Sequence, residues 1–178
     1  AVELRAAVEA AANWGTYVTV HAYTPAAVQR AIAAGVQCIE HAHLMDDATA
    51  RMMAEKGVWL SMQPLPDELA EGFPPGSEQR AKAVEVFAGT ARTYELAKKY
   101  GIKTAWGTDV LFSPALALQQ GALLAKIATW FTPAEALAQA CQIDVEHHHH
   151  EQEQHHDRAD IDQHQDNGQE LGLQQHPQ

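Results

Sequence analysis

The chain has 178 residues, 46% of them hydrophobic, and a formal net charge of −11. It is long enough for one sizeable core but shorter than the roughly 250 residues typical of a closed eight-unit barrel. Nine acids and a single base lie from Asp144 onward, so the rest of the chain carries only about −3. A nearly neutral body without a Lys/Arg cluster argues against a nucleic-acid partner, since phosphate binding depends on concentrated positive charge.

Targeting and redox features are few. Cys38 and Cys141 are too few for a disulfide framework. No apolar run approaches the roughly 20 residues needed to cross a bilayer, and the first residues are typical of an amphipathic helix. We expect a soluble chain with no membrane partner, cytoplasmic by default. The sequence opens at Ala1 without a methionine, so a longer parent could have carried a secretion signal, and localisation stays undetermined.

A unit of helix-forming residues, one glycine and a short apolar run occurs four times. Glycine just past a helix end permits the left-handed conformation that stops the helix, and here a strand-like run follows at once. The glycines are Gly15, Gly35, Gly57 and Gly101. The runs are 16–21, 36–41, 58–62 and 102–106, each rich in β-branched or aromatic residues. Strands that alternate with helices predict a parallel sheet.

Helix starts are marked by a hydroxyl residue before a proline, at Thr24, Ser113 and Thr132. Proline loses nothing at the first helical position, because its amide would lack a helical partner anyway. Glu135 adds a capping box with Thr132. In the long helix predicted at 77–100, one apolar stripe is expected to pack on the sheet. Its residues are Val84, Phe87, Ala88 and Ala91.

Prolines punctuate the segment 63–76, which predicts a loop without regular structure after the third strand. Loops at this end of a parallel barrel shape the substrate pocket, so Asp67, Glu68 and Phe73 are candidate substrate contacts. A proline-rich surface connector explains the segment equally well.

The helix–strand pattern ends at Asp144. Gln, His, Asp and Glu dominate 144–178, and such a segment buries too little apolar surface to offset its ordering entropy. We therefore predict a domain at 1–143 and a disordered, low-complexity tail at 144–178. The histidines at 147–150, with His155 and His156, could bind divalent metals loosely by composition alone.

Three acid–base residues, His21, His41 and Asp109, follow strand-like runs. The carboxyl ends of parallel strands meet at one mouth, so we expect these side chains to lie together. Imidazole nitrogens and a carboxylate suit zinc, which lowers the pKa of bound water to about 7 and polarises a carbonyl. The pattern therefore predicts a metal site.

Several linked motifs stand out along the chain: Val-Thr-Val-His-Ala-Tyr-Thr-Pro at 18–25, Ala-Ile-Ala-Ala-Gly-Val at 31–36, Ile-Glu-His at 39–41, Asp46, and Gly-Thr-Asp at 107–109. Together they resemble the amidohydrolase superfamily, nearest to its imidazolonepropionase-like and Xaa-Pro dipeptidase-like members. The resemblance implies an α/β fold, half of a (β/α)8 barrel with four parallel strands, corresponding to strands five to eight. It also implies that His21 and His41 bind one metal, while Asp109 binds the other and takes the proton of the hydrolytic water.

The resemblance further implies ligands that the matched stretch lacks: a His-x-His pair from strand one and a carboxylated lysine from strand four, both N-terminal to this region. His43 has the His-x-His spacing with His41 and could help bind metal or substrate, or it could be a hydrogen-bonded loop histidine. Tyr23 could reach a substrate carbonyl or cap the strand end.

Four parallel strands do not close a barrel, so their edges need a cover. We expect a homo-oligomer that joins two half-barrels about a two-fold axis. The predicted function is hydrolysis of an amide bond in a dipeptide or cyclic amide, present or ancestral, dependent on zinc or another divalent metal. The alternative is a catalytically inactive half-barrel without metal, serving as an oligomeric binding or structural scaffold.

Overall fold

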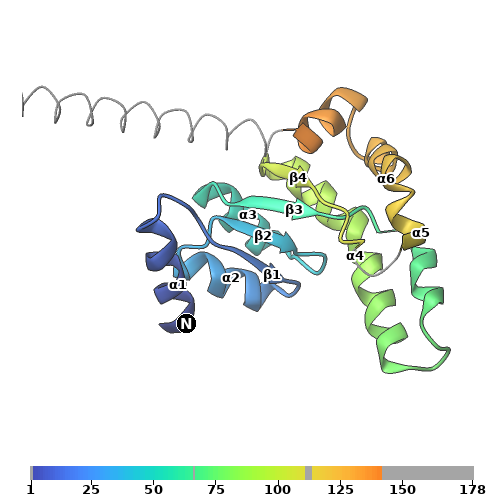
Figure 1. Ribbon diagram of the computed structural model, residues 1–178, viewed down its shortest axis with the longest axis horizontal. Coiled ribbons are helices and arrows are strands. Elements are labelled where there is room, and N and C mark those ends of the chain that lie inside the picture. Colours follow the sequence, from blue (N-terminus) through green and yellow to red (C-terminus); the bar gives the residue numbers. More distant parts are fainter. Residues whose placement is uncertain (1, 66, 111–113, 142–178) are drawn as a thin grey trace, which may run out of the picture. The chain divides into compact units, whose positions relative to one another are not determined.

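The structure is a computed structural model that describes residues 2–65, 67–110 and 114–141 (Figure 1). Ala1–Ala140 forms one compact unit, and Cys141–Gln178 falls outside it. The tail predicted at 144–178 and the predicted cap residue Ser113 lie outside the described residues. None of the described helices is long and apolar enough to cross a membrane.

A four-stranded parallel sheet lies at the centre of this unit, in the strand order β1-β2-β3-β4. The strands are β1 (Thr19–Ala22), β2 (Cys38–His41), β3 (Trp59–Met62) and β4 (Thr104–Trp106). Val20 lies opposite Ile39, and Ile39 lies opposite Leu60. The parallel sheet predicted from the helix–strand alternation is confirmed, although β1 ends one residue later than predicted.

Helices alternate with these strands along the chain. They are α1 (Val2–Ala12), α2 (Pro25–Ala34), α3 (Asp47–Lys56), α4 (Glu78–Tyr100), α5 (Pro114–Ala117) and α6 (Gln120–Lys126), followed by the 3-10 turn η2 (Ile127–Thr129) and a helix over 133–141. The Thr24 hydroxyl accepts from the Ala27 amide at the start of α2, which is the predicted cap. The capping box between Thr132 and Glu135 is also confirmed.

Apolar side chains from the sheet and from α2, α3 and α4 form one core. Its fully buried members include Val28, Ile39, Met53, Leu60 and Tyr94. Burying a side chain of this size is worth roughly 1.5–3 kcal/mol. The core therefore fixes where the carboxyl ends of β2 and β3 lie, and with them the residues that follow.

The apolar stripe predicted for α4 is wrong. Val84, Ala88 and Ala91 are exposed and Phe87 is only half-buried. The helix instead buries a face that includes Thr90, Thr93, Tyr94, Leu96 and Ala97. On this face Tyr94, Leu96 and Ala97 pack in the apolar core. Beside them the Thr93 hydroxyl reaches the backbone oxygens of Ala42 and His43, and the absence of a side chain at Gly89 lets the helix backbone come close to His43.

The segment predicted as an irregular loop after β3 contains regular structure, the 3-10 helix η1 (Asp67–Gly72), which packs on α4. The prolines flank this stretch and do not interrupt it, so its Asp-Glu-Leu-Ala-Glu sequence can form a short 3-10 helix. The side chains of Asp67 and Glu68 lie outside what the structure describes. Phe73, the third candidate substrate contact, is 38% exposed just beyond η1.

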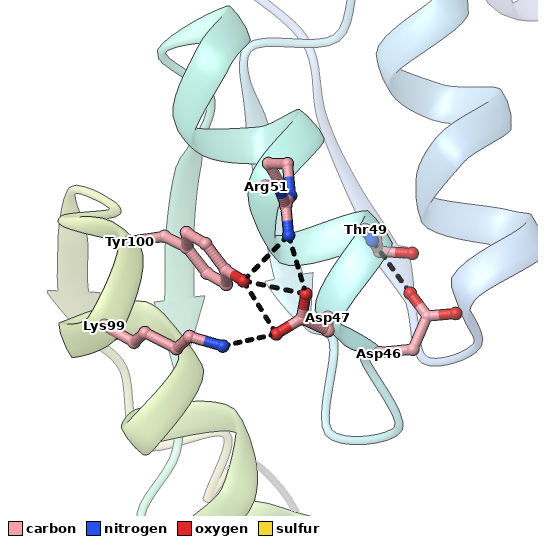
Figure 2. A network of polar contacts seen from close by, with 6 residues as sticks. All are labelled: Asp46, Asp47, Thr49, Arg51, Lys99 and Tyr100. Atoms are coloured by element: carbon pink, nitrogen blue, oxygen red, sulfur yellow. Dashed lines mark hydrogen bonds and ion pairs between the residues drawn. The ribbon is translucent and has the colours of Figure 1, made fainter.

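A polar cluster joins the first turn of α3 to the last turn of α4 (Figure 2). The Asp47 carboxylate accepts from Lys99 Nζ and from the Tyr100 hydroxyl at 2.7 Å, and from Arg51 at 3.2 Å. These hydrogen bonds, from Lys99 above all, lower the pKa of Asp47. The cluster is solvent-exposed, and ion pairs in such positions contribute little to stability.

Candidate metal centre

Two histidines meet at the carboxyl ends of adjacent strands. Nδ1 of His21, on β1, lies 2.8 Å from Nε2 of His41, at the end of β2. Parallel pairing places Ala22 opposite His41, so the two residues differ by one position in register and their rings reach each other across the strand ends. The structure therefore brings together two of the three residues predicted to bind metal.

Gln63, directly after β3, contacts the other ring nitrogen of His41. Nδ1 of His41 lies 2.8 Å from the side-chain oxygen Oε1 of Gln63, and an amide oxygen can only accept. His41 therefore donates through Nδ1–H, and its neutral ring has the lone pair on Nε2, facing His21. With both rings neutral, the short contact between them is a donation from His21 Nδ1–H to His41 Nε2. Two nitrogen atoms converge with one proton between them.

His43 is 1% exposed and lies beside this pair. Its Nε2–H donates to the backbone oxygen of Gln63 at 3.3 Å, and its Nδ1 has no hydrogen-bond partner among the described residues. Burial lowers the pKa of His43 to about 4, although the bond to Gln63 opposes that shift. His43 is thus a buried histidine that is hydrogen-bonded through Nε2 and has an unpartnered Nδ1, and burial favours its neutral ring.

Tyr23 and Asp109 lie at the same end of the sheet. The Tyr23 ring stacks on the His41 ring, with centroids 4.5 Å apart and planes 8° from parallel. Burial raises the pKa of Tyr23, and the Asp109 carboxylate raises it further. Asp109 also acts electrostatically on His43. However, within the described ranges no three or more His, Cys, Asp or Glu side chains form a group that could hold a metal ion, and this includes Asp109 together with the histidine pair.

Backbone strain gathers at these positions. His41, Ala42 and Asp109 have positive φ, at 79°, 50° and 50°, and none is glycine. Left-handed backbone costs a non-glycine residue on the order of 1 kcal/mol or more, and it persists only where the surroundings hold it. Strain of this kind is typical of functional sites.

Contacts from both sides hold the strained loop after β2. The Ala42 amide donates to Ala22 on the β1 side, and the Thr93 hydroxyl lies 3.2 Å from the Ala42 oxygen and 3.1 Å from the His43 oxygen on the α4 side. The residue Gly89 lies against the same backbone, because a side-chain carbon there would overlap the His43 oxygen. The loop is thus clamped between β1 and α4.

Sequence reasoning missed Gln63, Gly89 and Thr93. Gln63 had a usable signal, because it follows the run 58–62 just as His21 and His41 close their own runs. A glycine inside a long helix, such as Gly89, points to close backbone approach but does not name the partner.

The model of the amidohydrolase family matches residues 1–152. The chain belongs to the amidohydrolase family. The resemblance inferred from the motifs is therefore confirmed. No curated protein sequence matches the chain.

The four parallel strands of this chain and their helices match part of solved amidohydrolase structures. An amidohydrolase crystal structure is 36% identical with a TM-score of 0.71, over 81% of this chain and 35% of its own. A prolidase complexed with N-methylphosphonate-L-proline is 34% identical with a TM-score of 0.69, over 78% and 34%. A Xaa-Pro dipeptidase with bound methionine is 30% identical with a TM-score of 0.65, over 78% and 35%. The chain spans about a third of the length of these structures and matches part of their barrels.

Amidohydrolases are typically metal-dependent. The pair His21 and His41 could supply two of the ligands of a divalent metal, because two imidazole nitrogens converge and the far nitrogen of His41 faces the Gln63 oxygen. Imidazole nitrogens suit zinc and other borderline metals. The pair supplies two ligands, and an open catalytic site holds its metal with about three protein ligands.

Proposed function

We propose that this chain forms the part of a metal-dependent amidohydrolase that carries His21, His41 and Asp109, and that the whole site hydrolyses an amide bond in a dipeptide or cyclic amide. One observation carries the proposal: the 2.8 Å approach of His21 Nδ1 to His41 Nε2 from neighbouring strand ends. Two histidines that only pack in a core can do so with ordinary backbone angles, whereas His41 and Ala42 both have positive φ.

Each residue takes a role that its surroundings support. His21 and His41 hold the metal. When bound, the metal supplies a water of lowered pKa and polarises the scissile carbonyl. Asp109, exposed at the end of the β4 segment, adds a ligand or accepts the proton of that water. Tyr23 has a raised pKa, so its phenol stays protonated at neutral pH and can donate to the substrate carbonyl oxygen.

An Xaa-Pro dipeptide is the substrate we favour, because a prolidase and a Xaa-Pro dipeptidase are among the similar structures. The chain spans about a third of those proteins, so a closed barrel needs further strands. We propose that a second copy supplies them. Two features support this: the outer edge of β1 has no paired strand among the described residues, and α1 has no fully buried residue.

Zinc content and hydrolysis test the proposal together. The full chain, a His21→Ala variant and a control with residues 147–150 changed to alanine are dialysed against zinc, analysed for bound metal and assayed with Ala-Pro. We expect the control to keep one zinc per site, whereas His21→Ala loses it and loses hydrolysis by more than about 10-fold, since even residues that only support a ligand are worth that much. Zinc that disappears with residues 147–150 and persists in His21→Ala would contradict the assignment.

The scaffold alternative rests on a specific observation as well. The described residues bring only two metal-binding side chains together, and those two are already hydrogen-bonded to each other. A pair of this kind can serve as a structural link between β1 and β2. Light scattering separates the two functions: an oligomer that forms in the presence of a chelator and shows no zinc uptake favours the scaffold.

A further inference from the structure

Gln63 touches two histidines at once, and neither contact was anticipated from the motifs. Its side-chain oxygen accepts from His41 and its backbone oxygen accepts from His43. The residue is 3% exposed, so water does not compete for either bond. Gln63 is therefore placed to decide which nitrogen of each ring carries a proton.

The Gln63 side chain fits against the chain that follows β4. The residue Gly107 follows β4, and a side-chain carbon there would lie 3.3 Å from both Gln63 Nε2 and Ser61 Oγ. The absence of a side chain at 107 leaves room for the Gln63 amide group, which sits between His41 and the chain after β4. Any larger residue at 107 would press on the amide that orients His41.

The consequence for His41 is electronic. A neutral imidazole has one N–H and one lone pair, so a ring that donates through Nδ1 must offer its lone pair at Nε2. Without an acceptor at Nδ1, the ring is free to take the other tautomer, in which Nε2–H would point at His21 and no lone pair would face it. Partners of this kind orient metal-binding histidines and fix their tautomer.

We propose that Gln63 is a positioning residue: it holds His41 in the Nδ1–H tautomer and so presents the Nε2 lone pair to His21 and to a divalent cation. The part that concerns the cation rests on the proposed function. The part that concerns the tautomer does not, because it is a property of the metal-free chain.

The tautomer is tested by nitrogen-15 NMR of the histidine rings in the metal-free full chain. We expect His41, assigned by comparison with His41→Ala, to show a protonated Nδ1 and a bare Nε2. In Gln63→Leu that preference is lost, whereas in Gln63→Glu, which keeps an acceptor oxygen, it is retained. A wild-type His41 protonated at Nε2, or an unchanged pattern in Gln63→Leu, would overturn the proposal whatever happens with zinc.

Zinc affinity, measured by competition with a chelating dye, tests the second part. Gln63→Leu should bind zinc about 10- to 100-fold more weakly, and Gln63→Glu should recover most of the loss. The matched control is Gln29→Leu, because Gln29 bonds Thr49 at 2.8 Å and touches neither histidine. Equal losses in Gln29→Leu and Gln63→Leu would overturn the positioning role. A wild-type chain with the expected tautomer and no zinc would sink the proposed function and leave the tautomer assignment standing.

Discussion

The centre of the sheet and its β1 edge are built differently. Ile39 on β2 and Leu60 on β3 are fully buried, whereas on β1 Thr19 and His21 are exposed and Val20 is half-buried. The helix α1, which contacts α2, has no fully buried residue. We call the buried centre of the sheet the closed side and the exposed β1 edge the open side. The candidate site spans the boundary between them, because His41 comes from the closed side and His21 from the open side. The closed side can fix ligand geometry, and the open side can admit a ligand or a partner.

The largest effect is expected on the closed side, at Gly89. A side-chain carbon there would overlap the His43 oxygen and lie 2.8 Å from its carbonyl carbon, and both partners are backbone, so α4 must move. We expect Gly89→Ala to lower the free energy of unfolding by about 4 kcal/mol or more, measured by urea denaturation.

The control for Gly89 is Gly121→Ala on α6, where nothing lies within 4 Å of an added carbon. Alanine favours helix over glycine by up to ~1 kcal/mol, so this variant should be slightly more stable. Opposite signs at the two helical glycines are the diagnostic result. A stabilised Gly89→Ala would mean that α4 does not contact the loop after β2.

A matched pair of core substitutions compares the two sides directly. Ile39 and Val20 lie opposite each other in neighbouring strands. We expect Ile39→Ala to cost about 3 kcal/mol, within the range for truncating a buried side chain, and Val20→Ala to cost about 1 kcal/mol because Val20 is only half-buried. Denaturation midpoints at several protein concentrations check this. A Val20→Ala cost equal to that of Ile39→Ala would show that something covers the β1 edge in solution.

The same contrast explains what the sequence could predict. Local signals were sufficient for the strands, the caps at Thr24 and Thr132 and the convergence of His21 with His41, because glycine, proline and apolar runs act over a few residues. The packing face of α4 was mispredicted because Thr93 and Gly89 are selected by contacts with a loop some 50 residues earlier. Apolar periodicity does not report the part of a packing face that consists of a hydroxyl and a missing side chain. Gln63 was missed for a different reason: it follows the run 58–62 as His21 and His41 close theirs, but the prediction singled out only acid–base side chains at the strand ends.

The buried histidine of the closed side should make stability depend on pH. Burial holds the pKa of His43 at about 4 in the folded state, against about 6.5 when unfolded, so the unfolded chain binds more protons between these values. Stability is therefore full above about pH 6.5 and falls as pH drops toward 4. We expect about 2 kcal/mol of loss from His43 alone between pH 7.5 and pH 5.

Urea titrations of wild type and His43→Gln at both pH values isolate this contribution, because glutamine can donate to the Gln63 oxygen and does not titrate. The variant should lose clearly less stability than the wild type on acidification. Equal pH dependence in the two proteins would mean that His43 is accessible to water. The closed side would then not exclude solvent from its buried histidine.

The smallest effect is expected at the exposed polar cluster between α3 and α4 (Figure 2). Asp47→Asn removes the charge that Lys99 and Arg51 face, but all three side chains remain in contact with solvent. The lowered pKa of Asp47 means that its stabilisation is present at neutral pH and is lost only in strong acid. We expect a fall in thermal midpoint much smaller than that of Gly89→Ala, and smaller still in 1 M salt, which screens exposed charges. A fall in the thermal midpoint that salt does not reduce would show that hydrogen-bond geometry, and not charge, joins α3 to α4 here. The exposed polar cluster would then be as rigid as the closed side.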